Sequence, residues 1–303
     1  MSGTIDQMVV KRSSLSAAWQ RHERRWADNL YVYAVISRRS HGLSVGINLN
    51  PDKGCNFDCI YCQVDRQVPP RVRKVDLERL KAELDTILEA ARDGWLYEAP
   101  PYDALPAGQR TVRDIAFSGD GEPTAFPRFK QAVEIAVDAR RRFGLESTKL
   151  VLITDAACLT KPAVREALRI MDASNGEIWA KLDAGTEEYF SAVDRPNVSF
   201  RAVLDNILDA ARVRPVVIQS LFMRVHGERP PEGEIDAYCE RLNEILRGGG
   251  ELKAVQVYTI AREPAEAYVA PLTDAELDAI AAAVRSRVPA PVEVYYGVDA
   301  AFP

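Results

Sequence analysis

Strand-like and helix-like segments alternate along most of this 303-residue chain. Six short apolar segments have the composition of buried strands, and they occupy residues 43–49, 114–117, 149–153, 177–182, 215–222 and 252–260. After each of the first five comes a segment with apolar residues at helical spacing, and these lie at residues 76–92, 128–142, 160–171, 199–212 and 233–246. Strands that are separated by helices usually pair in parallel, so the sequence predicts an α/β fold built on a parallel sheet.

Polar residues follow most of the predicted strands. Three cysteines come after the first strand, residues 121–124 (Gly-Glu-Pro-Thr) after the second, Thr154 and Asp155 after the third, Asp183 after the fourth and Arg262 after the sixth. The carboxyl ends of parallel strands meet at one edge of a sheet, and ligands bind there. The sequence therefore predicts a ligand site at this edge.

The segments on either side of this alternation differ from it in character. We therefore divide the chain into an N-terminal extension (1–42), a barrel region (43–263) and a C-terminal tail (264–303). The extension contains a predicted helix at residues 14–30 and a short predicted strand at 31–36. In the tail, Thr273 and Glu276 form a capping box that predicts the start of a helix, and an edge strand is predicted at 292–296.

Cys55, Cys59 and Cys62 lie within eight residues, in the spacing C-x3-C-x2-C. Thiolates so close in sequence can bind one metal centre without help from distant parts of the chain. A structural zinc site needs a fourth ligand and usually has two C-x2-C pairs, and no further cysteine or histidine lies nearby. A 4Fe-4S cluster with three protein ligands would leave one iron open for a ligand, and this interpretation is favoured over zinc or unliganded cysteines. Cys158 and Cys239 are interpreted as small core residues.

The cysteine spacing, with the aromatic Tyr61 directly before the last cysteine, resembles the signature of the radical S-adenosylmethionine (radical SAM) superfamily. The resemblance implies a 4Fe-4S cluster whose open iron binds the amino and carboxylate groups of S-adenosyl-L-methionine (SAM). It implies reductive cleavage of SAM to methionine and a 5′-deoxyadenosyl radical, which takes a hydrogen atom from a substrate. The implied fold is a partial (βα)6 barrel, and the implied partner is an external one-electron donor such as flavodoxin or ferredoxin.

The same resemblance points to residues that would bind SAM. Gly121, Glu122 and Pro123 resemble the glycine-rich motif that receives the methionine ammonium group. A glycine bend exposes carbonyls and a carboxylate pairs with an ammonium group, so the residue types suit this role. Tyr61 is expected to pack near the adenine. The alternative at residues 121–123 is an ordinary strand-to-helix turn.

Lys181 and Asp183 alternate at the end of the fourth strand, so both point to one face of the sheet. A lysine can hold the methionine carboxylate, and an aspartate can accept hydrogen bonds from the ribose hydroxyls. The alternative for this pair is a salt bridge inside the barrel. Further candidates for cofactor binding are Thr154, Gln219 and Arg262.

Three longer segments resemble the branch of the superfamily that includes the 4-demethylwyosine synthases, which rebuild a guanine in tRNA using pyruvate. They are residues 41–49, 117–124 and 258–262, and the similarity extends over residues 33–263. The archaeal synthases carry additional N-terminal cysteines for a second cluster, whereas this chain has no cysteine before Cys55. The substrate of the synthases is therefore not assigned to this chain.

The charge of the chain bears on its partners. Its net charge of −5 provides no overall basic field, whereas a tRNA-binding protein usually carries a basic face. The first 50 residues are locally basic, which is more commonly a solvated amphipathic face than a phosphate-binding patch, although Arg21, Arg24 and Arg25 could dock RNA. We therefore expect a small-molecule or peptide substrate before RNA. An RNA-modifying radical SAM enzyme and a non-catalytic iron–sulfur or zinc protein remain as alternatives.

The distribution of apolar residues and cysteines indicates a cellular compartment. No apolar run approaches the ~20 residues that span a bilayer, and residues 1–8 lack the apolar core of a signal peptide. Five cysteines, three of them close together, do not form a disulfide framework. These features predict a cytoplasmic protein without a membrane partner.

Overall fold

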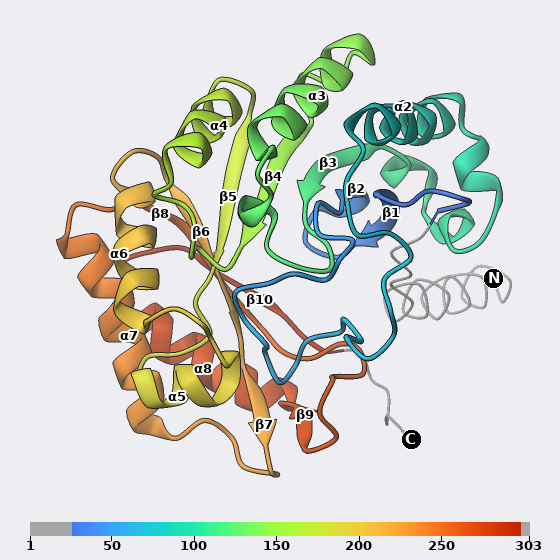
Figure 1. Ribbon diagram of the computed structural model, residues 1–303. Helices are drawn as coiled ribbons and strands as arrows, with labels where there is room; N and C mark the ends of the chain where they lie inside the picture. Colours follow the sequence, from blue (N-terminus) through green and yellow to red (C-terminus); the bar gives the residue numbers. More distant parts are fainter. Residues whose placement is uncertain (1–25, 298–303) are drawn as a thin grey trace, which may run out of the picture.

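The computed structural model describes residues 26–297, and an eight-stranded sheet forms its centre (Figure 1). The strands follow the order β1 (Val32–Ser37), β2 (Gly42–Ile47), β3 (Val112–Phe117), β4 (Lys149–Thr154), β5 (Gly176–Lys181), β6 (Val216–Leu221), β8 (Leu252–Tyr258) and β10 (Val292–Tyr295). From β2 to β10 every neighbouring pair is parallel, and β1 pairs antiparallel with β2. The sheet curls into an open half-barrel, so the predicted α/β partial barrel is confirmed.

Each of the first five predicted βα units has its helix close to the expected position. These helices are α2 (Leu77–Asp93), α3 (Phe129–Arg142), α4 (Pro162–Asp172), α6 (Phe200–Ala211) and α7 (Glu232–Arg247), and α8 (Asp274–Arg287) follows in the tail. The side chain of Asp76 caps α2, and Gly94 ends that helix at a φ of 89°, a conformation that favours glycine. The predicted capping box of Thr273 and Glu276 is present at the start of α8.

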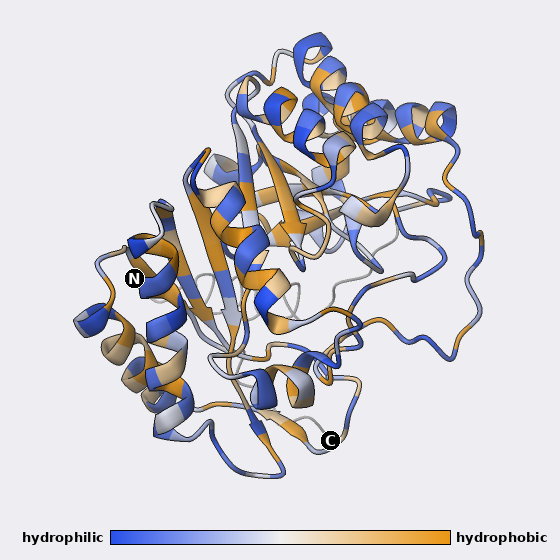
Figure 2. Cartoon of the chain, turned by 60° about the vertical axis from the view of Figure 1, so that its left-hand side comes forward, coloured by the Kyte–Doolittle hydropathy of each residue, from blue (hydrophilic) through white to orange (hydrophobic). Residues whose placement is uncertain are grey.

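The helices cover the convex face of the sheet and form the main core with it. Outward-facing strand residues such as Leu43, Ile115 and Ile218 are buried completely, as are Leu80 and Leu242 of the covering helices. Apolar residues accordingly concentrate in the strands and on the inner side of the helices (Figure 2). Burial of each such side chain contributes about 1.5–3 kcal/mol. The concave face carries a smaller apolar cluster, which consists of Ala116, Val151, Trp179, Val217 and Ala254.

Several elements were not predicted. Residues 187–194 form a short helix, α5 (Glu187–Asp194), and β7 (Met223–Val225) pairs antiparallel with β9 (Val269–Pro271). Residues 95–110, between α2 and β3, contain short 3-10 helices, which are Trp95–Glu98, Tyr102–Ala104 and Ala107–Gln109. A further 3-10 turn, Pro123–Ala125, follows β3.

The turn between β1 and β2 reaches the opposite edge of the curled sheet. The guanidinium of Arg38 donates a hydrogen bond of 2.5 Å to the carbonyl oxygen of Tyr296, just after β10. Arg39 lies 4.4 Å from the ring centroid of Tyr258 on β8 and 5.9 Å from that of Tyr295 on β10. Two arginines therefore bridge the open side of the half-barrel between its edge strands.

Two predictions about the N-terminal extension concern residues that lie mostly outside the described range. The predicted helix at 14–30 lies mostly outside this range, as do Arg21, Arg24 and Arg25, while residues 26–30 form a turn. The division into three parts at residues 42 and 263 stays a prediction. Within residues 26–297, no helix is both long and apolar enough to span a bilayer.

Candidate functional site

The loop that carries the cysteines is attached to the end of β3. The backbone N–H of Glu122 donates a hydrogen bond of 3.2 Å to the carbonyl oxygen of Gly54. A Cβ atom at Gly121 would lie only 1.8 Å from that same oxygen. Glycine is therefore required at residue 121, because only a residue without a side chain lets the two backbones approach so closely.

The other side of the cysteine loop is attached to α5. The backbone N–H groups of Asp58 and Ile60 donate to the carbonyl oxygens of Asp194 and Val193, at 3.0 and 2.9 Å. Those carbonyls belong to the last turn of the helix, where backbone acceptors have no partner within the helix. The ring of Phe57 also packs edge-on against that of Phe190, with centroids 5.4 Å apart. The short helix that sequence patterns missed thus supports the cysteine loop.

The three cysteines are half-buried and face different neighbours. The Sγ atom of Cys55 lies 3.9 Å from a carboxylate oxygen of Asp155, and burial together with Asp155 raises the pKa of this thiol to about 12. Burial, and then the carboxylate of Asp194, raise the pKa of Cys59 well above its ordinary value. Burial lowers the pKa of the Arg66 guanidinium, but interactions with Cys62, Cys55 and Asp58 together outweigh burial and raise that pKa.

The cysteine loop fits an iron–sulfur cluster by the chemistry of its donors. Three thiols on one eight-residue segment are a suitable ligand set, and each would bind as a thiolate. In this conformation, however, the thiols point to separate partners, and no three Cys, His, Asp or Glu side chains within residues 26–297 converge so that they could hold a metal ion. The cluster ligands Cys55, Cys59 and Cys62 therefore stay a prediction.

Glu122 is at the centre of a buried polar network that joins β3 to β4. Its Oε1 atom accepts hydrogen bonds from the backbone N–H and the hydroxyl of Thr124 and from the hydroxyl of Thr154, the last at 2.7 Å. Its Oε2 atom accepts one from the backbone N–H of Asp155, also at 2.7 Å. Burial and the nearby Glu122 raise the pKa of Asp155 well above its ordinary value. We call Glu122 and Asp155 the clamp pair.

A second buried network lies at the end of β5. The Lys181 ammonium is 3.0 Å from the Asp183 carboxylate and donates a hydrogen bond of 2.5 Å to the hydroxyl of Tyr258. The hydroxyl of Tyr61 donates to Asp183 and, at 3.3 Å, to Asp194. Burial and the nearby Asp183 raise the pKa of Asp194. We call this group the lysine cluster, and it brings together three residues that sequence reasoning had selected, Tyr61, Lys181 and Asp183.

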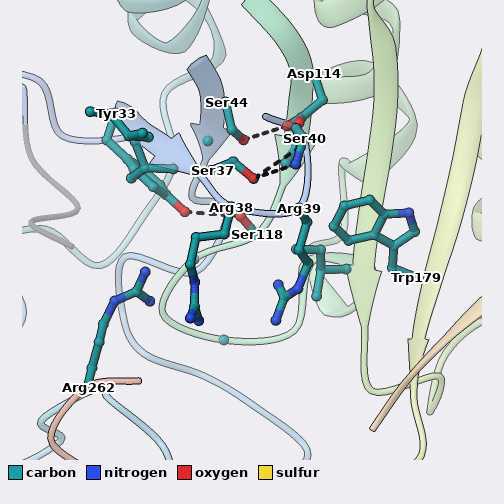
Figure 3. A pocket seen from close by; sticks show the side chains of 17 residues that line it. Tyr33, Ser37, Arg38, Arg39, Ser40, Ser44, Asp114, Ser118, Trp179 and Arg262 are labelled. Carbon is teal, nitrogen blue, oxygen red and sulfur yellow. Dashed lines mark hydrogen bonds between the residues drawn. The ribbon is translucent and has the colours of Figure 1, made fainter. Parts of the chain in front are cut away.

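Two adjoining cavities occupy the concave side of the half-barrel. The first has a volume of ≈ 240 Å³, and the candidate residues that line it are Tyr61, Cys62, Lys181, Gln219 and Arg262. The second has a volume of ≈ 270 Å³ and is lined by residues that include Gly121, Trp179 and Arg262. Arg262 lines both cavities, as do Arg38 and Arg39, so the cavities form one hollow around these arginines (Figure 3).

The remaining candidates from the sequence have structural contacts of their own. The side chain of Gln219 is buried and donates to that of Gln256 at 2.8 Å. Arg262 donates to the side chain of Gln63 at 3.2 Å. Thr154 is buried against Glu122, and Pro123 opens the 3-10 turn after β3. Their predicted roles in cofactor binding are not tested by these contacts.

Three polar residues of this region were not selected as candidates from the sequence. Asp155 was grouped with Thr154 after the third predicted strand, but its contact with the cysteine loop carries no sequence signal. Asp194 ends α5, and the signals for that helix were Thr186 as a cap and two glutamates in its first turn. Arg66 follows the last cysteine by four residues and carried no motif.

Comparison with known proteins yields relatives of low identity. No protein-family model matches the chain. A UPF0026 protein of Helicobacter pylori is 24% identical over 228 residues, which cover 74% of this chain and 66% of that protein. A protein named GTPase Obg of Brachyspira hyodysenteriae is 26% identical over 253 residues, which cover 80% of this chain but only 32% of that protein. The present chain has no Gly-Lys pair of the kind that ends a nucleotide-binding P-loop.

Solved structures show what the fold resembles. A radical SAM methyltransferase from Sphaerobacter thermophilus superposes with a TM-score of 0.60 at 14% identity, over 88% of this chain and 70% of that one. TYW1, a 4-demethylwyosine synthase solved with a lysine–pyruvate adduct, gives a TM-score of 0.51 at 12% identity, over 94% of this chain and 90% of that one. Similarity at this level of identity concerns the fold. The chain has the fold of the radical SAM enzymes, as its cysteine motif predicted.

Proposed function

We propose that this chain is a radical SAM enzyme, which cleaves SAM reductively at a single 4Fe-4S cluster and uses the resulting radical to take a hydrogen atom from a substrate. One observation carries the proposal. Three cysteines in radical SAM spacing lie in the loop after the first parallel strand of a sheet with the radical SAM fold, at the edge where such sheets bind ligands. The loop is fixed there by hydrogen bonds to both Glu122 and α5.

Cys55, Cys59 and Cys62 would hold the cluster, and three protein ligands leave one iron open. A bound cluster supplies the electron that cleaves SAM to methionine and a 5′-deoxyadenosyl radical. The chain's own contribution is to fix the position of SAM and the substrate and to keep water out of the half-barrel. The electron would come from an external donor such as flavodoxin or ferredoxin.

The lysine cluster supports a SAM site in the ≈ 240 Å³ cavity. The Lys181 ammonium, now paired with Asp183 and the Tyr258 hydroxyl, has the charge to bind the methionine carboxylate. Asp183 has the acceptor oxygens to bind ribose hydroxyls, and the Tyr61 ring offers an apolar face near the last cysteine. Gln219 and Arg262 line the same cavity and add donors.

The hydrogen bonds that Glu122 already accepts restrict how its carboxylate could bind the methionine ammonium group, the role that the resemblance implies. Its Oε1 atom already accepts three hydrogen bonds, so only Oε2, which accepts one, has room for the methionine ammonium group. Gly121, Pro123 and Thr154 then act by holding this carboxylate and the cysteine loop in place. We propose that Glu122 has both functions, and that its structural one has the larger energetic effect.

A cleavage assay tests the proposed function. Protein reconstituted with iron and sulfide without oxygen, then reduced with dithionite, is expected to convert SAM to 5′-deoxyadenosine. Cys59→Ala should abolish the product, whereas the matched control Cys239→Ala should keep it, because Cys239 lies in the core of α7 away from the loop. Equal product from both variants, or none from the unchanged protein, would contradict the proposal.

We propose a small molecule or a peptide as the substrate in preference to RNA. The hollow is lined by side chains from the edge strand β1 and from strands as far along the sheet as β8, which suits a ligand that enters the half-barrel. If added tRNA raises the rate of 5′-deoxyadenosine formation and the tRNA itself increases in mass, RNA would instead be supported as the substrate.

A further inference from the structure

Three guanidinium groups face the hollow of the half-barrel from two directions. Arg38 and Arg39 come from the turn between β1 and β2, and Arg262 comes from the segment after β8 (Figure 3). All three line both the ≈ 270 Å³ cavity and the adjoining ≈ 240 Å³ cavity. The cysteine motif and the predicted SAM ligands do not require Arg38 or Arg39.

Arg38 and Arg39 form no ion pair with a carboxylate among residues 26–297. Arg38 donates one hydrogen bond, to the carbonyl of Tyr296, and Arg39 lies over the ring of Tyr258. A guanidinium has five N–H donors, so most donors of both side chains remain available to a ligand. Two adjacent cations without an acidic partner are unfavourable in a partly buried position, and an anion would relieve this.

The surroundings disfavour the charge of Arg38 as long as no anion lies beside it. Burial, and then the neighbouring Arg39, lower the pKa of Arg38 to about 10. The carboxylate of Asp114, which also lines the cavity, already accepts hydrogen bonds from the hydroxyls of Ser40 and Ser44. Ala116, Ile153 and Trp179 form an apolar wall, and a weakly polar wall makes charge–charge attraction stronger than in water.

We propose that Arg38 and Arg39 bind an anionic group of the substrate, a carboxylate or a phosphate, in the ≈ 270 Å³ cavity. That the anion belongs to a substrate rests on the proposed function, whereas the binding of an anion at these arginines does not. Arg262 lines the boundary with the cavity assigned to SAM, so an anion held by Arg38 and Arg39 would place the rest of its molecule beside that cofactor. The substrate class is thus a small acid or a phosphorylated small molecule.

Isothermal titration calorimetry at fixed ionic strength tests the site, with inorganic phosphate in one arm and citrate in the other. The unchanged protein is expected to bind at least one of them, and the stronger ligand identifies the source of the anion. Arg39→Gln and Arg38→Gln should each weaken binding by about tenfold, because each removes a charged planar donor. Arg39→Lys should weaken it less, since the charge remains.

The matched control is Arg201→Gln, on the exposed side of α6, which should bind as the unchanged protein does. If Arg38 and Arg39 only bridge the sheet edges, all three glutamine variants will bind alike, or no anion will bind below ~10 mM, and the proposal is then wrong. Arg39→Lys keeps the test informative if Arg38→Gln fails to fold. Anion binding is measured without SAM or reductant, so it is independent of the cleavage assay. If the unchanged protein cleaves SAM but binds no anion, this site alone is contradicted. If it binds the anion at Arg38 and Arg39 but does not cleave SAM, the proposed function alone is contradicted.

Discussion

Two buried acid pairs lie beside the cysteine loop, and they are neutralised in different ways. Among the described residues, the clamp pair, Glu122 and Asp155, accepts hydrogen bonds from uncharged groups, which are hydroxyls, an amide side chain, backbone N–H groups and the thiol of Cys55. The other pair, Asp183 and Asp194, has the ammonium group of Lys181 next to it, in addition to the backbone N–H of Leu221, which donates to Asp183 at 2.6 Å. The first pair lies near Cys55 and the second near Cys59.

This difference indicates different tasks. Neutral donors from fixed backbone cannot be exchanged for a ligand without breaking the ends of β3 and β4, so the clamp pair holds the loop in place. Lys181 is a flexible cation, and its partners can be replaced by the carboxylate and hydroxyls of a ligand. The clamp pair should therefore affect stability most, and the lysine cluster should affect ligand binding most.

The largest effect on stability is expected from Glu122→Gln. The new amide group places a donor against one of the four donors that now surround the carboxylate, so the free energy of unfolding should fall by about 3 kcal/mol. Urea unfolding followed by circular dichroism measures this. Glu166→Gln, which removes an exposed partner of Lys130, should cost less than about 1 kcal/mol. Similar losses for both variants would show that no clamp exists.

Gly121→Ala tests the same contact through the backbone. The new Cβ would meet the carbonyl oxygen of Gly54, and moving the cysteine loop away should cost about 2 kcal/mol. Gly233→Ala is the control, because no atom lies within 4 Å of its added Cβ and it occupies the first turn of α7. That control should leave the free energy of unfolding unchanged or raise it slightly. A tolerated Gly121→Ala would rule out the close approach.

Asp183→Asn should have a smaller effect on stability and a larger one on ligand binding. Lys181 keeps Asp194 and the hydroxyl of Tyr258 as neighbours, so the loss should be about 1–2 kcal/mol. Affinity of the reconstituted protein for SAM, measured by equilibrium dialysis, should fall by about tenfold or more. The reverse pattern, a large loss of stability with unchanged affinity, would assign this cluster to structure instead.

Asp114 extends the comparison, because it also accepts hydrogen bonds from uncharged donors, the hydroxyls of Ser40 and Ser44. Burial raises its pKa above the ordinary value of 3.8, so the folded state holds a proton that the unfolded state has lost between that value and the folded pKa. The contribution of Asp114 to stability should therefore fall as pH rises through this window. The free energy of unfolding is measured by urea unfolding at successive pH values. Asp114→Asn should remove the part of its pH dependence that comes from Asp114, up to about 1 kcal/mol. If the free energy of unfolding depends on pH in the same way in the unchanged protein and in Asp114→Asn, the raised pKa of Asp114 is contradicted.

The sequence predicted the strands and most helices because those segments carry local patterns. The six strands predicted to be parallel, the helices between them and α8 are defined by apolar composition, helical spacing and caps such as Asp76 and Thr273. The edge of the sheet that carries the polar residues follows from the parallel order. By contrast, α5 has only eight residues and few apolar ones, so its pattern was too short to stand out.

The contacts of the site depended on information that sequence patterns do not contain. Tyr61 and Asp183 are 122 residues apart in the chain, and only the packing of the cysteine loop on α5 brings them together. Arg38 and Arg39 belong to no sequence motif, and their place in the hollow requires the curl of the whole sheet. Glu122 was selected for a ligand, whereas its internal hydrogen bonds appear only when β3 and β4 lie side by side.

The central claim is that the cysteine loop holds one cluster, and the iron and sulfide content tests it most directly. After reconstitution without oxygen, the unchanged protein and Cys239→Ala should contain about four irons and about four sulfides per chain. Cys55→Ala, Cys59→Ala and Cys62→Ala should each lose most of both. One zinc without sulfide, or loop variants that retain as much iron as Cys239→Ala, would contradict the account.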